Sequence, residues 1–173
     1  YDKYLPNIHN KEKITGSGYV QPYVDSPLDN ETVGEIVYMN LINKANRYIY
    51  ITTPYLILDN EMVTALSIAA KNGLDVKIIT PGIPDKKTIN EVTKAYYDVL
   101  IESGVKIYEY TKGFIHAKTF IVDDLYATVG TINLDYRSLY LNFECGVLLY
   151  KSATIEDIKE DYHEILKYSK KVK

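Results

Sequence analysis

GFIHAKTFIVDDLYATVGTINLDYRSLYLNFE, residues 113–144, is the stretch that decides how this chain folds. β-Branched and aromatic residues dominate three runs within and just beyond it, a composition typical of strands. We expect these strands at residues 115–122, 126–129 and 143–149. Asp123 and Asp124 predict a turn between the first two. No helical pattern separates the runs, so the stretch predicts strands that lie side by side in a sheet.

Outside this stretch, strand-like runs alternate with amphipathic runs of helical period. Strands are expected at residues 19–24, 48–53, 75–80 and 105–110, and helices at 32–45, 60–72, 89–103 and 155–168. Asn60 is the expected cap of the second helix. The alternation predicts an α/β fold, a mixed β-sheet flanked by helices on both faces. Residues 9–18 are polar and end in Gly-Ser-Gly, so residues 1–18 are expected to be the remnant of a linker and residues 19–173 one domain.

The chemistry-bearing residues of the central stretch are His116 and Lys118. They lie two apart on a predicted strand, so both side chains project from the same face. An imidazole beside an ammonium suits a phosphate, because the lysine neutralises its oxygens and the imidazole attacks phosphorus or transfers a proton. The chain reversal brings the neutral donors Thr131 and Asn133 towards the same end. Glu144 is placed to accept the other ring proton of His116 and fix its tautomer.

An H-x-K triplet alone is more often a surface pair, but here the triplet belongs to a longer pattern. H-x-K is followed by four spacers, an aspartate, six spacers and G-T-x-N. The fixed positions are His116, Lys118, Asp123, Gly130 and Asn133. Chance agreement at all five is on the order of 10⁻⁶ per starting point. The spacing therefore indicates a functional site.

This pattern resembles the HKD motif of the phospholipase D superfamily. Further runs are similar to those of bacterial cardiolipin synthases and extend the resemblance from about Tyr19 to the last helix. They are Thr52-Thr53-Pro54-Tyr55, the stretch from Tyr97-Asp98 to Ile107-Tyr108-Glu109-Tyr110, Asn133-Leu134-Asp135-Tyr136-Arg137-Ser138, and Leu141-Asn142-Phe143-Glu144. The resemblance is to the C-terminal half of such enzymes, and it implies a phospholipase D-like domain with one HKD motif.

The resemblance implies a site made of two HKD motifs that meet across a pseudo-two-fold axis. One histidine attacks phosphorus to form a phosphohistidine, and the other protonates the leaving oxygen. His116, on the C-terminal motif, is then the general acid, Lys118 and Asn133 bind phosphate with Thr131 in support, and Glu144 orients His116. The reaction moves a phosphatidyl group from one phosphatidylglycerol to another, with no metal or organic cofactor.

Two residues of the pattern have ambiguous roles. Asp123 is grouped with His116 and Lys118 as catalytic because the motif includes it. Five residues after Lys118, however, it falls on the other side of the strand or into the turn, where a structural role is expected. Arg137 is open between an ion pair with Asp135 or a sheet neighbour and contact with a lipid headgroup.

The composition narrows the classes of molecule that this chain is expected to bind. The formal net charge of −3 gives no overall basic footprint for nucleic acid. Cys145 is the single cysteine, so no internal disulfide forms. No apolar run is long enough to span a bilayer, and the start at Tyr1 indicates a piece of a longer protein. We expect a soluble fragment of a protein whose anchor holds it at the cell membrane, with the catalytic domain on the cytoplasmic side.

The chain contains one HKD motif where a complete site needs two. Either the N-terminal HKD half of the same protein supplies the second, or a single-motif phosphodiesterase or nuclease dimerises with the site on its symmetry axis. The cardiolipin-synthase runs and the acidic balance favour the first explanation and a phospholipid substrate over nucleic acid. A scaffold without activity is the third reading, and the intact chemical residues disfavour it.

Overall fold

The computed structural model describes residues 16–173. Residues 1–15 of the linker expected over residues 1–18 therefore lie outside the described residues. The strands are β1 (Tyr19–Asp25), β2 (Tyr48–Thr52), β3 (Leu56–Ile57), β4 (Asp75–Pro81), β5 (Lys106–Tyr110), β6 (Thr119–Val122), β7 (Tyr126–Gly130), β8 (Leu134–Asp135), β9 (Glu144–Tyr150) and β10 (Ser169–Lys171). The helices are α1 (Val33–Lys44), α2 (Asn60–Lys71), α3 (Lys87–Ala95), α4 (Tyr97–Glu102), α5 (Tyr136–Tyr140) and α6 (Thr154–Lys167).

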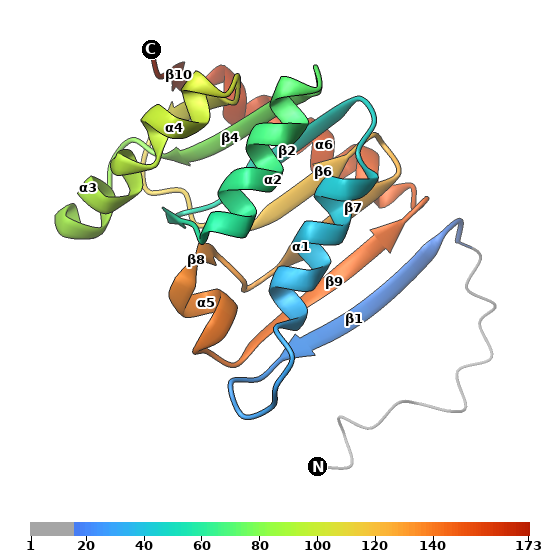
Figure 1. The fold of residues 1–173 in the computed structure, drawn as a ribbon. Helices are drawn as coiled ribbons and strands as arrows, with labels where there is room; N and C mark the ends of the chain where they lie inside the picture. Colours follow the sequence, from blue (N-terminus) through green and yellow to red (C-terminus); the bar gives the residue numbers. More distant parts are fainter. Residues whose placement is uncertain (1–15) are drawn as a thin grey trace.

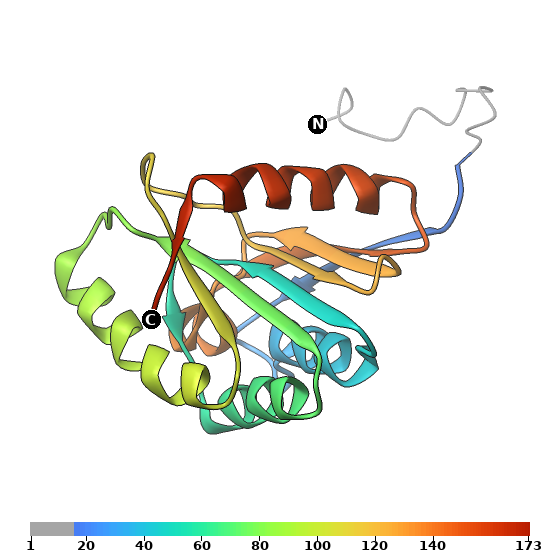
Figure 2. The same cartoon turned by 90° about the horizontal axis from the view of Figure 1, so that it is seen from above.

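Eight strands form one sheet in the order β1-β9-β7-β6-β2-β4-β5-β10 (Figure 1). β2, β4 and β5 run parallel, and the remaining pairings in this sheet are antiparallel. Figure 2 shows α6 alone on one face, with α1, α2, α3 and α4 on the other. The predicted mixed sheet with helices on both faces is confirmed.

The centre of the sheet is apolar on both faces, and β2 illustrates why. All five of its residues are buried. Ile49 and Ile51 belong to the core under α1 and α2, while Tyr48 and Tyr50 belong to the core under α6. Side chains alternate across a strand, so a strand covered on both sides must be apolar at every position. This is why the run at 48–53 was recognisable as a strand.

Two helix predictions were wrong in detail. The helix expected through Ile89 to Gly104 is two helices, because the chain turns at Tyr96 between α3 and α4. Asp59, not Asn60, caps α2, and its carboxylate accepts a hydrogen bond from the Met62 backbone N–H at 2.7 Å. Either residue type serves at this position, so the sequence alone did not separate them. No helix within residues 16–173 has the length and apolar character needed to cross a bilayer.

Candidate active site

The predicted site lies where the parallel strands end. β2 stops at Thr52, which pairs with Thr119, the first residue of β6. The strand predicted over residues 115–122 is therefore shorter than expected, and His116 and Lys118 precede it. Pro54 has no backbone N–H with which to extend the β2 ladder, and among residues 16–173 the β2–β6 pairing ends at Thr52 and Thr119. The two side chains are set by a loop at the carboxyl edge of the parallel strands, where α/β sheets commonly bind ligands.

Four of the predicted site residues line one cavity of about 420 Å³. They are His116, Lys118, Thr131 and Asn133. The rest of the lining is backbone and small side chains of β6, β7 and the adjoining loops. An imidazole, an ammonium, a hydroxyl and an amide around one cavity match the groups that bind a phosphodiester.

Lys118 is the charged group at the inner side of this cavity. Its side chain is buried, with 9% exposed, and its ammonium donates to the His116 carbonyl oxygen at 2.7 Å. Burial lowers the pKa of Lys118, while the charges of Glu144 and Asp135 oppose the shift. Neither carboxylate forms an ion pair with it within residues 16–173. A buried ammonium with spare donors attracts an anion.

Two aromatic rings lie near the ring of His116. The ring centroid of Phe114 is 5.3 Å away and that of Tyr55 is 6.5 Å away. Desolvation and the Lys118 charge lower the pKa of His116, and the Asp85 carboxylate opposes them. The surroundings of His116 therefore favour the neutral imidazole over the charged ring.

Asp85 is a site residue that the sequence analysis missed. It follows β4 in the loop at the same edge of the sheet, and its carboxylate accepts a hydrogen bond from the Tyr55 hydroxyl at 2.7 Å. The available signal was topological, since loops after parallel strands β2 and β4 meet at one edge. This edge can be identified only once the order of the strands in the sheet is known.

Glu144 holds a different partner from the one expected. Its carboxylate accepts hydrogen bonds from the Thr131 hydroxyl and, at 3.2 Å, from the Asn142 side-chain amide. Within residues 16–173 it makes no hydrogen bond to His116, so the expected contact is absent from this structure. The reason is position, because His116 sits in the loop before β6 rather than on the strand. Glu144 instead fixes Thr131 and acts on Lys118 through its charge.

Asn133 is anchored but keeps unused polar capacity. Its amide nitrogen donates to the Ser138 hydroxyl at 2.9 Å. Its carbonyl oxygen is buried and lacks a hydrogen-bond partner within residues 16–173. A half-turn of the amide would let the oxygen accept from Ser138 and would present the N–H donors to an anion. An under-satisfied buried amide at a cavity is typical of a ligand site.

Gly130 explains one fixed position of the pattern. A Cβ on this residue would lie 2.4 Å from the Cys145 carbonyl oxygen and 2.7 Å from the Gly146 Cα. These are backbone atoms of β9 that have no freedom to move aside. The glycine therefore allows β7 to approach β9 closely just before Thr131 enters the cavity.

Asp123 lies at the opposite end of β6, roughly 16 Å along an extended strand from Lys118. Its carboxylate accepts from the backbone N–H groups of Asn46, Arg47 and Tyr48 at 2.7, 2.9 and 2.8 Å. It is buried and does not line the cavity. Grouping Asp123 with the catalytic residues is corrected by this geometry, and the structural role expected from its spacing fits.

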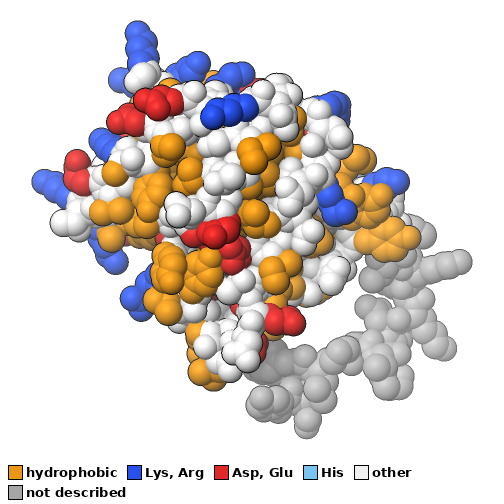
Figure 3. Space-filling view, viewed as in Figure 1, with side chains coloured by type: hydrophobic (Ala, Val, Ile, Leu, Met, Phe, Trp, Pro, Cys, Tyr) orange, Lys and Arg blue, Asp and Glu red, His pale blue; other side chains and the backbone are white. Residues whose placement is uncertain are grey.

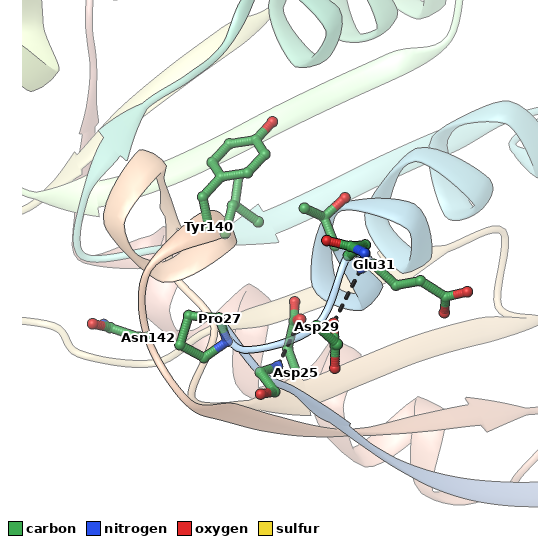
Figure 4. Close-up of a pocket in the computed structure, with 10 residues that line it drawn as sticks. Asp25, Pro27, Asp29, Glu31, Tyr140 and Asn142 are labelled. Carbon is green, nitrogen blue, oxygen red and sulfur yellow. Dashed lines mark hydrogen bonds between the residues drawn. The ribbon is translucent and has the colours of Figure 1, made fainter.

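A second cavity, of about 210 Å³, lies between the loop after β1 and α5 (Figure 4). Asp25, Asp29 and Glu31 line it. The first two carboxylates already accept hydrogen bonds from nearby backbone N–H groups. Its carboxylates would repel a phosphate, so this cavity does not compete with the one at His116. Residues 16–173 hold no cluster of three or more His, Cys, Asp or Glu arranged for a metal ion.

Comparison with known proteins agrees with this geometry. The family model described as "Cardiolipin synthase, PLD-like domain" matches residues 38–166. A cardiolipin synthase of Geobacillus sp. (strain WCH70) is 43% identical over 88% of this chain and 30% of its own length. One from Clostridium perfringens (strain 13 / Type A) is 39% identical over 98% of this chain and 36% of its own. An uncharacterized Streptococcus mutans protein is 58% identical over 94% of this chain and 35% of its own. The chain spans about a third of the length of these relatives.

Solved structures share the fold. Nuc from Salmonella typhimurium, a phospholipase D family member, superposes with a TM-score of 0.76 at 19% identity, over 91% of this chain and 99% of its own. Phosphatidylserine synthase from Haemophilus influenzae gives 0.71 at 21% identity, over 88% of this chain and 40% of its own. With the family model, the fold and the intact HKD pattern in agreement, the chain belongs to the phospholipase D-like domain family of cardiolipin synthases.

Proposed function

We propose that this chain is one catalytic half of a phosphatidyltransferase that joins two phosphatidylglycerol molecules into cardiolipin. The observation that carries the proposal is the single cavity lined by His116, Lys118, Thr131 and Asn133. The cardiolipin synthases named above support the choice of lipid. The net charge of −3 disfavours a polyanionic nucleic acid.

In the proposed reaction, the phosphodiester of the donor lipid binds between Lys118, Thr131 and Asn133. A histidine of a second HKD half attacks phosphorus, a P–N bond forms, and the P–O bond to glycerol breaks. His116 gives its proton to the glycerol oxygen. The hydroxyl of the acceptor lipid then attacks phosphorus and gives its proton to His116. A new P–O bond forms as the P–N bond breaks, which restores the phosphodiester and frees the first histidine.

His116 must be protonated to serve as the acid, although its surroundings lower its pKa. The negative charge of a bound phosphodiester raises that pKa, because an anion in contact favours the charged ring. Substrate binding and protonation are then coupled. Glu144 contributes by holding Thr131 and by its charge near Lys118.

The second half of the site needs a docking surface, and one part of the sheet is suited to it. The sheet face that carries α6 continues over β1, β7 and β9, where several apolar side chains are exposed among residues 16–173. Its exposed members include Val20, Val24 and Val129, of which Val129 also lines the cavity. An exposed apolar face next to an incomplete site supports packing of a second HKD half there. The proposed partner is the N-terminal half of the same protein, with the membrane reached through that protein.

The test is cardiolipin formation by the full-length protein from phosphatidylglycerol vesicles, with glycerol release as the second readout. We expect His116→Ala to lower turnover by roughly 10²-fold or more while the protein stays folded. Lys87→Gln, on the exposed start of α3 away from the cavity, is the control. Cleavage of DNA without added metal, lost in His116→Ala and accompanied by no cardiolipin, would replace this proposal with a homodimeric nuclease.

A further inference from the structure

A groove of about 340 Å³ runs between α3, α5 and β3, beside the cavity at His116. Its walls are mostly apolar and include Ile57, Ile89 and Leu141. Leu141 is 60% exposed. Figure 3 shows hydrophobic side chains gathered on the side of the molecule where α3 and α5 lie. The volume falls in the lower range of small-molecule pockets, which suits one flexible chain rather than a bulky ligand.

Two cationic side chains, Lys86 and Arg137, line the same groove. Within residues 16–173 neither forms an ion pair with a carboxylate. Asp135 is the one carboxylate in the lining, and it is buried and accepts a hydrogen bond from the Ser138 backbone N–H at 2.8 Å. The groove therefore offers apolar walls and two uncommitted positive charges, which is complementary to an anionic amphiphile.

Tyr55 connects the groove to the site. Its side chain lines the groove, and its ring centroid is 6.5 Å from that of His116. The Asp135 carboxylate, also in the lining, is close enough to act on the charge of Lys118. A ligand that fills the groove therefore ends next to the reacting phosphate.

We propose that this groove binds the acceptor lipid: one acyl chain packs on Ile57, Ile89 and Leu141, and Lys86 and Arg137 hold the acceptor's own phosphate. This inference rests on the proposed function. The acceptor phosphatidylglycerol carries a phosphate that does not react, and two phosphate anions cannot share the cavity around Lys118. A second pair of cations beside an apolar groove supplies the separate place that the second phosphate needs.

The test compares two reactions that share the donor lipid and differ in the acceptor. The full-length protein is given phosphatidylglycerol vesicles with labelled glycerol. Exchange of glycerol into phosphatidylglycerol uses a small acceptor, and cardiolipin formation uses a lipid acceptor. In the double variant Lys86→Gln/Arg137→Gln we expect the ratio of cardiolipin formation to glycerol exchange to fall about tenfold or more, because charge-assisted hydrogen bonds to the phosphate are lost. Leu141→Asp, which places a charge in the acyl path, lowers the same ratio.

Lys87→Gln is the matched control, since it removes a neighbouring positive charge that does not line the groove. Its ratio stays at the wild-type value. An unchanged ratio of cardiolipin formation to glycerol exchange in the groove variants overturns the inference. An equal fall of this ratio in Lys87→Gln also overturns it, because it would indicate general attraction of the protein to the vesicle. Loss of both reactions in equal proportion also overturns it, since that assigns the groove to the donor. A wild-type protein that performs neither reaction refutes the proposed function itself.

Discussion

At one end of β6 the loop of His116 and Lys118 opens on a cavity, and at the other end Asp123 and Asp124 form a tight turn. The Lys118 ammonium is buried without an ion pair among the described residues. Asp123, by contrast, accepts three backbone hydrogen bonds, and Asp124 accepts from Arg47, Tyr48 and Lys159. Both ends belong to one sequence motif.

The electrostatics of the two ends differ accordingly. Burial raises the pKa of Asp124, but hydrogen bonds from Lys159, Tyr48 and Arg47 outweigh it and lower that pKa to about 2. At the cavity end burial lowers the pKa values of both His116 and Lys118, and the charge of Lys118 lowers that of His116 further. The Asp124 carboxylate at the turn has partners that favour its charged form, whereas His116 and Lys118 form no ion pair with a carboxylate among residues 16–173. Paired groups stabilise the domain, whereas under-partnered groups bind and react.

The largest expected effect is at the cavity end. In the full-length protein, Lys118→Met should lower phosphatidyl transfer by roughly 10²-fold or more, because a charge that stabilises the transition state is lost. Its free energy of unfolding should change by no more than about 1 kcal/mol, because the desolvation penalty of a buried ammonium is also removed. Turnover assays and urea denaturation measure the two quantities. A strongly destabilised variant with normal turnover per folded molecule would make Lys118 a structural residue and erase the contrast.

At the turn end of β6 we expect the opposite result, a loss of stability without a loss of turnover. Asp123→Ala should lower the free energy of unfolding by about 3 kcal/mol, because buried N–H donors left without an acceptor cost about 1–3 kcal/mol each. Turnover per folded molecule should stay near that of the wild type. The free energy of unfolding of Asp123→Asn, which keeps one acceptor oxygen, should lie between those of the wild type and Asp123→Ala. Wild-type stability combined with lost turnover would return Asp123 to the catalytic group.

The smallest expected effect is a change in the pKa of His116, which tests the charges at the cavity end of β6. The positive charge of Lys118 lowers the pKa of His116, so Lys118→Met should raise that pKa. Asp85→Asn should lower it, because the Asp85 carboxylate favours the charged ring. Chemical shifts of the His116 ring protons against pH measure both changes. Shifts with the reverse signs would mean that neither charge acts on the ring as this geometry implies.

Features of this chain that depend on residues adjacent in the sequence could be predicted from it. The Asp123-Asp124 turn was expected from composition, and both residues have positive φ, 57° and 61°, which aspartate tolerates. The strand expected at residues 48–53 is β2, whose five residues are all buried. Pattern reasoning failed where two rules compete. The start of β6 depends on where its neighbour β2 ends, and the break at Tyr96 depends on packing of α3 and α4 that periodicity does not encode.

The sequence by itself determined the family, the α/β layering and the four residues that line the cavity at His116, because hydrophobic period and a fixed spacing of chemical groups are local properties of the chain. Only the tertiary structure decided that Asp123 is structural, that Glu144 holds Thr131, and that Asp85 and Tyr55 join His116. It alone placed Lys86 and Arg137 around one groove. These relations arise from the strand order, which brings together loops far apart in the sequence, and no local pattern records which loops will meet.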